Sequence, residues 1–205
     1  MYIPEKMKIT DKNDSHQFIK NHGFATIVSK TLNATHLPFL LDENEGEHGT
    51  LYCHFARANP HWQQLENNDA LVIFNGPHAY ISPTWYAGKP NVPTWNYAAV
   101  HVYGTFELLD DEQTLAVVNN TIAKYEPQLL KQDDIIPADY RDKLLKGIVG
   151  GKITINEIAG KYKLGQHRKA EDQQGVVKGL AQCQDQDSAA LLSFMQQVNV
   201  GLGES

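Results

Sequence analysis

The segment HFARANPHW, residues 54–62, carries the strongest local signal for chemistry. Its order predicts that a strand ends here, that Arg57 follows, and that a helix opens at Asn59 and Pro60. Free backbone N–H groups at a helix N-terminus and one guanidinium group together suit an anion such as a phosphate. The alternative is an ordinary capped helix with an arginine on the surface.

A second candidate is an aromatic stretch between residues 80 and 103. It contains the proline-rich loop PTWYAGKPNVPTW at 83–95 and the start of a long alternating strand. A rigid aromatic loop can form one wall of a site for a flat ligand through stacking and burial. A loop that covers the core, or an interface between two copies, explains the pattern equally well. The aromatic residues are Tyr80, Trp85, Tyr86, Trp95, Tyr97 and Tyr103.

A third candidate is the basic stretch KYKLGQHRK at 161–169, in a chain whose formal net charge is −6. Lysine and arginine side chains this close together could contact a phosphate or DNA. The alternative is a solvated run of charge. DNA binding has little further support, because an acidic chain gains no global attraction to a phosphate backbone and no DNA-binding module is recognisable.

The histidines and cysteines do not predict a metal site. Cys53 and His54 are adjacent, so they would face opposite sides of a strand, and neither HxxxH nor CxxC occurs. The sequence also lacks the GxSxG motif of a serine hydrolase and a GxGxxG motif that opens a helix. We therefore expect no metal and assign no catalytic residue.

Composition predicts a globular protein of the cytoplasm. The 205 residues are 41% hydrophobic and 20% charged, which is enough apolar material for a core. Two cysteines favour a reducing compartment, and neither an apolar leader nor an apolar run long enough for a membrane span is present.

The elements that must position these residues are strands first and helices later. No alternation of strand, helix and strand is visible, so an antiparallel barrel decorated by helices fits best. The expected strands are 24–31, 35–41, 50–55, 70–74, 78–82, 95–109 and 148–155, and the expected helices are 15–22, 59–67, 111–126, 138–146, 171–182 and 187–199.

Several blocks together resemble one family. They are MYIP at 1–4, ATHLP at 34–38, HFARANPHW at 54–62, GPHAYISPTWY at 76–86, VPTWNYAAVHVYG at 92–104, GIVG at 147–150, KYKLGQHR at 161–168 and GVVKGL at 175–180. In this order they are similar to the PaiB family, which is described as FMN-binding negative transcriptional regulators. One departure is that Gly165 and His167 stand where the family usually has serine and asparagine.

The resemblance implies a mainly β fold with added helices (α+β), a split β-barrel of the pyridoxamine-phosphate-oxidase-like, FMN-binding type. It implies a single domain over residues 1–205 with a C-terminal helical extension from about residue 170. It also implies a homodimer with flavin mononucleotide (FMN) in a cleft at the dimer interface. From the candidates and the resemblance together, the residues expected to bind the cofactor are Thr35, His36, Arg57, Asn59, Trp85, Tyr86, Thr94, Trp95, Asn96, Lys163, Gln166 and Arg168.

The function expected is that of an FMN-binding protein, most simply a flavin-dependent oxidoreductase or flavin reductase. The flavin would perform the redox chemistry, with a nicotinamide reductant or a small molecule as its partner. His36 is the best candidate for a group near the flavin, with a core-facing histidine as the alternative. Two other functions stay open, a DNA-binding repressor, as the family name states, and a flavin-binding or haem-related module without catalysis.

Overall fold

The computed structural model describes residues 1–132 and 134–203. Their contacts divide the chain into two compact units. Unit 1 contains Met1–Asp11, Asn75–Val100 and the chain from Ala159 onward. Unit 2 contains Lys12–Phe74 and His101–Ile158.

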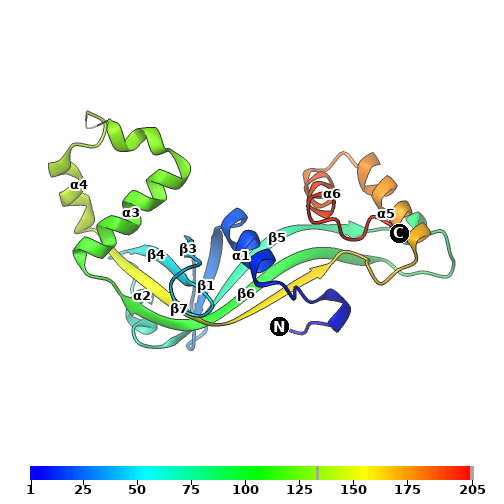
Figure 1. Cartoon of the computed structure of the whole chain (residues 1–205), viewed down its shortest axis with the longest axis horizontal. Coiled ribbons are helices and arrows are strands. Elements are labelled where there is room, and N and C mark those ends of the chain that lie inside the picture. The colour runs from blue at the N-terminus through cyan, green and yellow to red at the C-terminus, as the bar shows by residue number, and fades with distance from the viewer. Residues whose placement is uncertain (133, 204–205) are drawn as a thin grey trace. The chain divides into compact units, whose positions relative to one another are not determined.

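Seven strands form one sheet in the order β2-β1-β5-β6-β7-β4-β3, and the long strands β5, β6 and β7 lie side by side (Figure 1). The pairs β1–β2, β1–β5, β3–β4 and β4–β7 are antiparallel. Within unit 2, β2 at one edge of the sheet also contacts β4 near the other edge, so the sheet curls toward closure. The strands are β1 (Phe24–Ser29), β2 (Ala34–Pro38), β3 (Leu40–Asp42), β4 (Thr50–Ala56), β5 (Asp69–Ile81), β6 (Thr94–Leu108) and β7 (Ile148–Lys163).

The sheet corrects the strand predictions in three places, and in the first of them the strand predicted over 148–155 is β7, which continues to Lys163. The predicted strands 70–74 and 78–82 are one strand, β5, which continues through Pro77. Proline is tolerated here because β1 pairs with β5 only from Ala70 to Ile73, so the missing N–H leaves no gap in that ladder. The predicted strand 35–41 is divided at Phe39 into β2 and β3. Pro38 ends β2, an edge strand, as its lack of a donor predicts.

Six α-helices and three 3₁₀ helices accompany the sheet in the described parts of the chain. The best-defined start is that of α3, where the side chain of Asp110 accepts the N–H of Gln113 at 2.8 Å and the Gln113 side chain accepts the N–H of Asp110. Their bounds are α1 (Lys12–Asn21), α2 (His61–Leu65), α3 (Asp111–Tyr125), α4 (Ala138–Leu145), α5 (Ala170–Gln182), α6 (Gln186–Val198), η1 (Glu5–Met7), η2 (Pro83–Trp85) and η3 (Pro127–Lys131).

The core of unit 2 is built from phenylalanines of the sheet. Phe39 and Phe74 meet edge to face with their ring centroids 5.9 Å apart, and Phe55 and Phe106 meet at the same separation. Burying each of these phenylalanine side chains stabilises the unit by about 1.5–3 kcal/mol. Gly104 of β6 permits a close approach of two backbones, because a Cβ there would stand 2.3 Å from the carbonyl oxygen of Thr154.

Unit 1 has its own core beneath the two C-terminal helices. Trp85 of η2 packs on α5, and Phe194 of α6 meets Tyr162 with their ring centroids 5.4 Å apart. Leu180, Leu191 and Met195 are almost fully buried there. In the part of the chain that the structure describes, no helix is long and apolar enough to cross a membrane. The predicted fold class, mainly β with added helices, is confirmed.

Candidate functional site

Three polar residues of unit 2 form a connected cluster where β2 meets the start of α2. The hydroxyl of Thr35 lies 2.8 Å from Nδ1 of His61, and Nδ2 of Asn59 donates to that hydroxyl at 3.2 Å. The Asn59 side chain also accepts the backbone N–H of His61 at 3.1 Å, which fixes the start of this short helix. Thr35 and Asn59 were predicted site residues, and the structure brings them together through His61.

His61 is a residue that sequence reasoning missed. It is 4% exposed, and burial lowers its pKa, so the imidazole is neutral at pH 7. The Thr35 hydroxyl, which accepts from Asn59, can donate its proton to Nδ1 of His61 or accept a second hydrogen bond from it, and when it donates, the proton of the neutral ring sits on Nε2. Among the described residues, this Nε2 has no hydrogen-bond partner. A buried polar atom without a partner is costly, which makes Nε2 of His61 a candidate contact for a ligand.

Arg57 lies nearby in sequence, and its guanidinium group holds backbone carbonyls. Nε donates to the carbonyl of Lys146 at 2.7 Å, and one terminal nitrogen donates to the carbonyl of Ile148 at 2.8 Å. The side chain therefore fixes the connection between α4 and β7. A cavity of about 540 Å³ beside it is lined by Arg57 and Lys146 as well as by Asp111 and Glu112, so the formal charges of its lining balance.

His36 is exposed and faces away from the core. Its ring stacks on that of Phe24 with the centroids 6.3 Å apart. The alternative of a core-facing histidine is therefore wrong, because residue 36 lies on the face of β2 opposite Leu37, which is buried.

Unit 1 holds a second group of predicted residues, around Lys163 at the end of β7. The ammonium of Lys163 donates to the hydroxyl of Thr94 at 2.7 Å and to the carbonyl of Trp95 at 2.5 Å. Burial, Lys161 and Arg168 lower the pKa of Lys163. Both lysines lie over the ring of Tyr97, at 5.2 Å for Lys161 and 6.0 Å for Lys163. Positive charge is thus concentrated on an aromatic surface.

Three aromatic rings beside these lysines are open to solvent. Trp95 is 47% exposed, and its ring centroid lies 5.8 Å from that of His78 and 6.3 Å from that of Tyr80. We call Trp95, Tyr97, Tyr80, His78 and Lys163 the aromatic–lysine face. Asn96, by contrast, is 3% exposed and points to the opposite side of β6.

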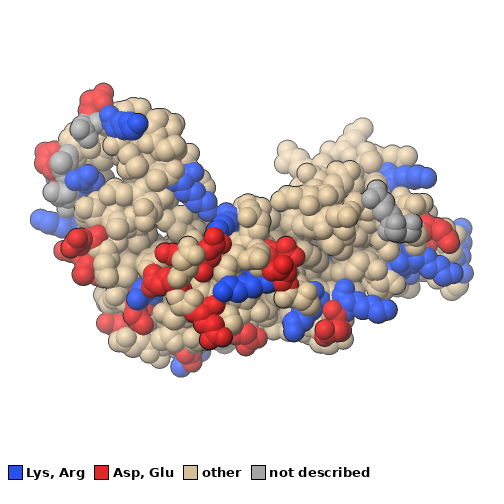
Figure 2. Space-filling view, in the orientation of Figure 1, with Lys and Arg blue, Asp and Glu red and all other residues tan. Residues whose placement is uncertain are grey.

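Arg168 is tied to the loop after η2. One of its terminal nitrogens donates to the side chain of Asn91 at 2.7 Å, and the guanidinium lies 4.5 Å from the ring centroid of Tyr86. Asp172 of α5 accepts the backbone N–H of Ala87 at 3.0 Å in the same loop. On the side of the molecule drawn in Figures 1 and 2, lysine and arginine side chains lie near α5 and the end of β7.

Two other predicted residues have structural contacts of their own. Gln166 accepts the N–H of Leu164 at 2.9 Å and donates to the carbonyls of Lys6 and Tyr162. The indole of Trp85 rests on α5, where it leaves no room for a side chain at residue 179. Gln166 and Trp85 therefore each have a structural role within the chain.

The predicted site residues thus fall into two groups. Unit 2 holds Thr35, His36, Arg57 and Asn59, and unit 1 holds Trp85, Tyr86, Thr94, Trp95, Asn96, Lys163, Gln166 and Arg168. Within unit 2 the structure joins Thr35 to Asn59, and within unit 1 it joins Lys163 to Thr94 and Trp95. Their roles toward a cofactor stay predictions. The described residues hold no group of three or more histidine, cysteine or acidic side chains suited to a metal ion.

Solved structures with a similar fold include two from bacteria. The flavocytochrome Anf3 of Azotobacter vinelandii has a TM-score of 0.57 at 16% identity, over 78% of this chain and 70% of that one. The FAD and heme binding protein of Mycobacterium smegmatis has a TM-score of 0.58 at 15% identity, over 78% of this chain and 74% of that one. At these identities the likeness shows the fold, which agrees with the predicted split barrel.

The sequence comparisons show the family. The "Protease synthase and sporulation protein PAI 2" of Bacillus subtilis is 35% identical over 204 residues, which cover 96% of this chain and 97% of that protein. Residues 1–157 match the model of the family described as "Putative FMN-binding domain". The first finding confirms the resemblance to PaiB, the second confirms the prediction of FMN as the cofactor, and the chain belongs to this FMN-binding domain family.

Proposed function

We propose that this protein is an FMN-dependent oxidoreductase that acts as a homodimer. The observation that carries the proposal is the family match over residues 1–157, together with the buried ring nitrogen of His61 that has no partner among the described residues. The bound flavin would supply electron or hydride transfer, and the protein would supply binding, orientation and electrostatics. The described residues fit such a group in two places.

The phosphate end of FMN fits the segment from Arg57 to His61. Among the described residues, Nε2 of His61 has no hydrogen-bond partner, and in its protonated form it would donate to a phosphate oxygen. Asn59 and the remaining guanidinium nitrogen of Arg57 are the next donors within the same segment. This placement keeps the sequence prediction for Arg57 and Asn59 and adds His61 as the buried member.

The isoalloxazine fits the aromatic–lysine face of unit 1. Trp95 and Tyr97 offer apolar rings, and Lys163 offers a positive charge that would stabilise the negative charge of the reduced flavin. In a homodimer, one copy could supply the phosphate segment and its partner this face. The exposed rings of Trp95, Tyr80 and His78 support such an interface, because large aromatic side chains are enriched in interface cores.

The electron donor would be a nicotinamide nucleotide or another small reductant. Cys53 and Cys183 are both free thiols, which supports the expected reducing compartment, the cytoplasm.

DNA binding, the function in the family's name, is not our first proposal. The sequence feature that favours DNA binding is the basic stretch at 161–169. In the structure, however, Lys161 is 6% exposed and donates to the carbonyl of Tyr2 at 3.1 Å. Lys163 and Arg168 have partners within the chain as well. Contacts with a phosphate backbone need free, exposed cations in larger number.

The deciding experiment is to purify the protein, record its visible spectrum, and titrate it with FMN and with riboflavin. We expect FMN to bind, to raise the melting temperature and to be reduced by a nicotinamide nucleotide, and light scattering to give a dimer. If neither flavin binds, the cofactor proposal is wrong. If FMN binds to a protein that remains a monomer, the interface proposal is wrong.

DNA is tested separately by fluorescence anisotropy with a promoter fragment at low and physiological salt. Submicromolar affinity at physiological salt, with a steep salt dependence that Lys161→Ala and Lys169→Ala remove, would favour the repressor over the oxidoreductase.

A further inference from the structure

Unit 2 contains a cavity that no predicted flavin residue lines. It has a volume of about 740 Å³, within the range of small-molecule sites. Helix α3 forms one wall, and α1, β3, β4 and the loop after β3 form the others. The lining residues are Lys20, Leu40, Leu41, Asp42, Glu43, Asn44, Glu45, Tyr52, Leu109, Gln113, Ala116, Val117, Asn120 and Lys152.

The floor of the cavity is apolar. Leu40 and Leu41 of β3 and Leu109 are half-buried, and Val117 of α3 is 4% exposed. These side chains would bury the hydrocarbon part of a ligand, at about 25 cal/mol for each Å² removed from water.

The rim of the cavity is charged, and its carboxylates outnumber its ammonium groups. Lys20 lies 2.6 Å from Glu43, and Lys152 lies 3.7 Å from Glu45 and 3.6 Å from Glu107. Tyr52 donates its hydroxyl proton to Glu45, and burial raises the pKa of this phenol, so it remains a donor. Each rim lysine is therefore neutralised already. Asp42 has no lysine partner in the part of the chain that the structure describes.

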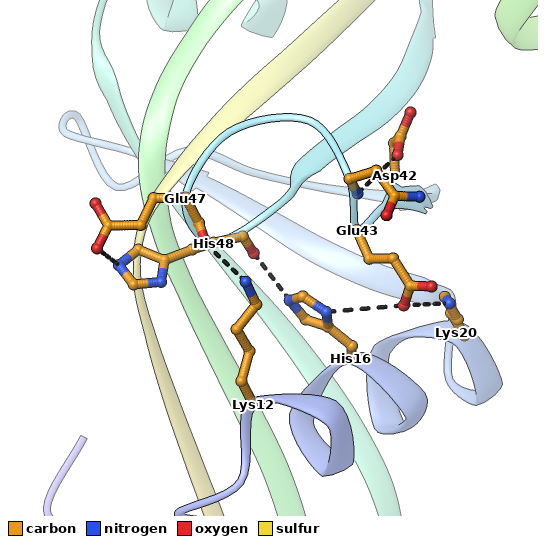
Figure 3. A network of polar contacts seen from close by, with 8 residues as sticks. Lys12, His16, Lys20, Asp42, Glu43, Glu47 and His48 are labelled. Atoms are coloured by element: carbon orange, nitrogen blue, oxygen red, sulfur yellow. Dashed lines mark hydrogen bonds and ion pairs between the residues drawn. The ribbon is translucent and has the colours of Figure 1, made fainter.

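The loop after β3, residues 43–49, is held in place by contacts with α1. Two side chains of α1 contact backbone carbonyls of this loop (Figure 3). Lys12 donates to the carbonyl of Glu47 at 2.7 Å, and a ring nitrogen of His16 lies 2.9 Å from the carbonyl oxygen of His48. His16 also lies 3.9 Å from Glu43. The carboxylate of Asp42 accepts the backbone N–H of Asn44 at 2.9 Å, so Asp42 and Glu43 both have defined positions at the rim of the cavity.

We propose that this cavity binds a small amphiphilic primary amine, with the hydrocarbon on the apolar floor and the ammonium at the carboxylates of Asp42, Glu43 and Glu45. An ammonium ion is attracted to a rim whose excess charge is negative, and an organic anion of the same shape is repelled. FMN, which carries a phosphate, is a poor occupant for the same reason. The inference is therefore independent of the proposed flavin function.

The test is calorimetric titration of the FMN-loaded protein with n-octylamine hydrochloride and, in parallel, with sodium octanoate. We expect one octylamine per chain, bound at least about tenfold more tightly than octanoate. Absence of octylamine binding, or equal binding of octanoate, would overturn the inference. So would release of FMN on adding octylamine, because the cavity would then be the flavin site.

A pair of variants on α3 localises the binding. Ala116 lines the cavity and is exposed, whereas Ala123 is equally exposed on the same helix but does not line it. Ala116→Phe should reduce octylamine affinity at least about tenfold by filling the cavity, and Ala123→Phe should leave it unchanged. If both variants behave alike, the amine binds elsewhere.

A second pair tests the charge. Glu43→Gln frees Lys20 from its partner, so octylamine should weaken and octanoate should gain affinity. Glu47→Gln is the matched control, because the Glu47 side chain does not line the cavity. Equal amine affinity in the Glu43→Gln variant and the unmodified protein would contradict the role of the rim.

Discussion

Gly179 of α5 lies directly against the indole of Trp85. A Cβ at residue 179 would stand 2.2 Å from Cδ2 of that ring, closer than any real contact allows. The position of the aromatic loop therefore depends on a helix about ninety residues further along the chain. Because residue 179 has no side chain, the indole of Trp85 can pack directly on that helix.

The first prediction follows from this contact. Gly179→Ala should lower the free energy of unfolding by about 1–3 kcal/mol, because the indole must move or the helix must shift. Urea denaturation measures the change. Gly88→Ala is the control, since a Cβ there meets nothing within 4 Å, and it should change stability by less than about 0.5 kcal/mol. Equal effects of the two substitutions would show that the contact does not matter.

The second prediction concerns His61. His61→Phe keeps a ring of similar size and removes the Nε2 donor, so FMN affinity should fall by about tenfold to a hundredfold, as expected for a hydrogen bond to a charged group. Riboflavin, which has no phosphate, should bind nearly as before. The measurement is quenching of flavin fluorescence in parallel titrations. If riboflavin weakens as much as FMN, His61 acts on the ring or on the fold instead.

The third prediction separates two roles of Arg57. Arg57→Ala removes the donors to the carbonyls of Lys146 and Ile148, so the melting temperature should fall even without flavin. If Arg57 also binds the phosphate, FMN affinity should drop at least about tenfold more than riboflavin affinity. A melting shift with an unchanged ratio of the two affinities would assign Arg57 to the connection between α4 and β7 alone.

Sequence reasoning succeeded where signals are local. The helix predicted over 111–126 is α3 (Asp111–Tyr125), and the side chains that fix its start, Asp110 and Gln113, are only three residues apart. It failed where distant partners decide, as in β5, which continues beside β6 through Gly76 and Pro77, where the sequence predicts a break between two strands.

The same limit applies to the candidate site. His61 gains its role from Thr35, 26 residues away, and Lys163 gains its role from Thr94, 69 residues away. The residue types were visible in the sequence, but the hydrogen bonds that orient them depend on tertiary structure.

The fourth prediction is that stability falls as the pH drops below about 6.5, the ordinary histidine pKa. Burial lowers the pKa of His22, His54 and His61, so the unfolded chain binds protons before the folded protein does. Stability is therefore complete above the unfolded pKa and is lost as the pH falls through the folded values. Urea denaturation between pH 8 and pH 5 measures the loss. His61→Phe should make it smaller, and an unchanged pH dependence in that variant would remove His61 from the explanation.

The last prediction tests the proposed position of the flavin ring at Lys163. Lys163→Met keeps the length of the side chain and removes a positive charge beside the face formed by Trp95 and Tyr97. A nearby cation favours reduced flavin, so its loss should lower the midpoint potential by about 30 mV, which for a two-electron couple is a tenfold change in the equilibrium. Spectroscopic titration against a reference dye measures it. Lys169→Met is the control, because that lysine is exposed and no described hydrogen bond or ion pair ties its side chain to this face. If both variants keep the potential of the unmodified protein while binding FMN normally, Lys163 does not face the ring, and the aromatic–lysine face serves the dimer contact alone.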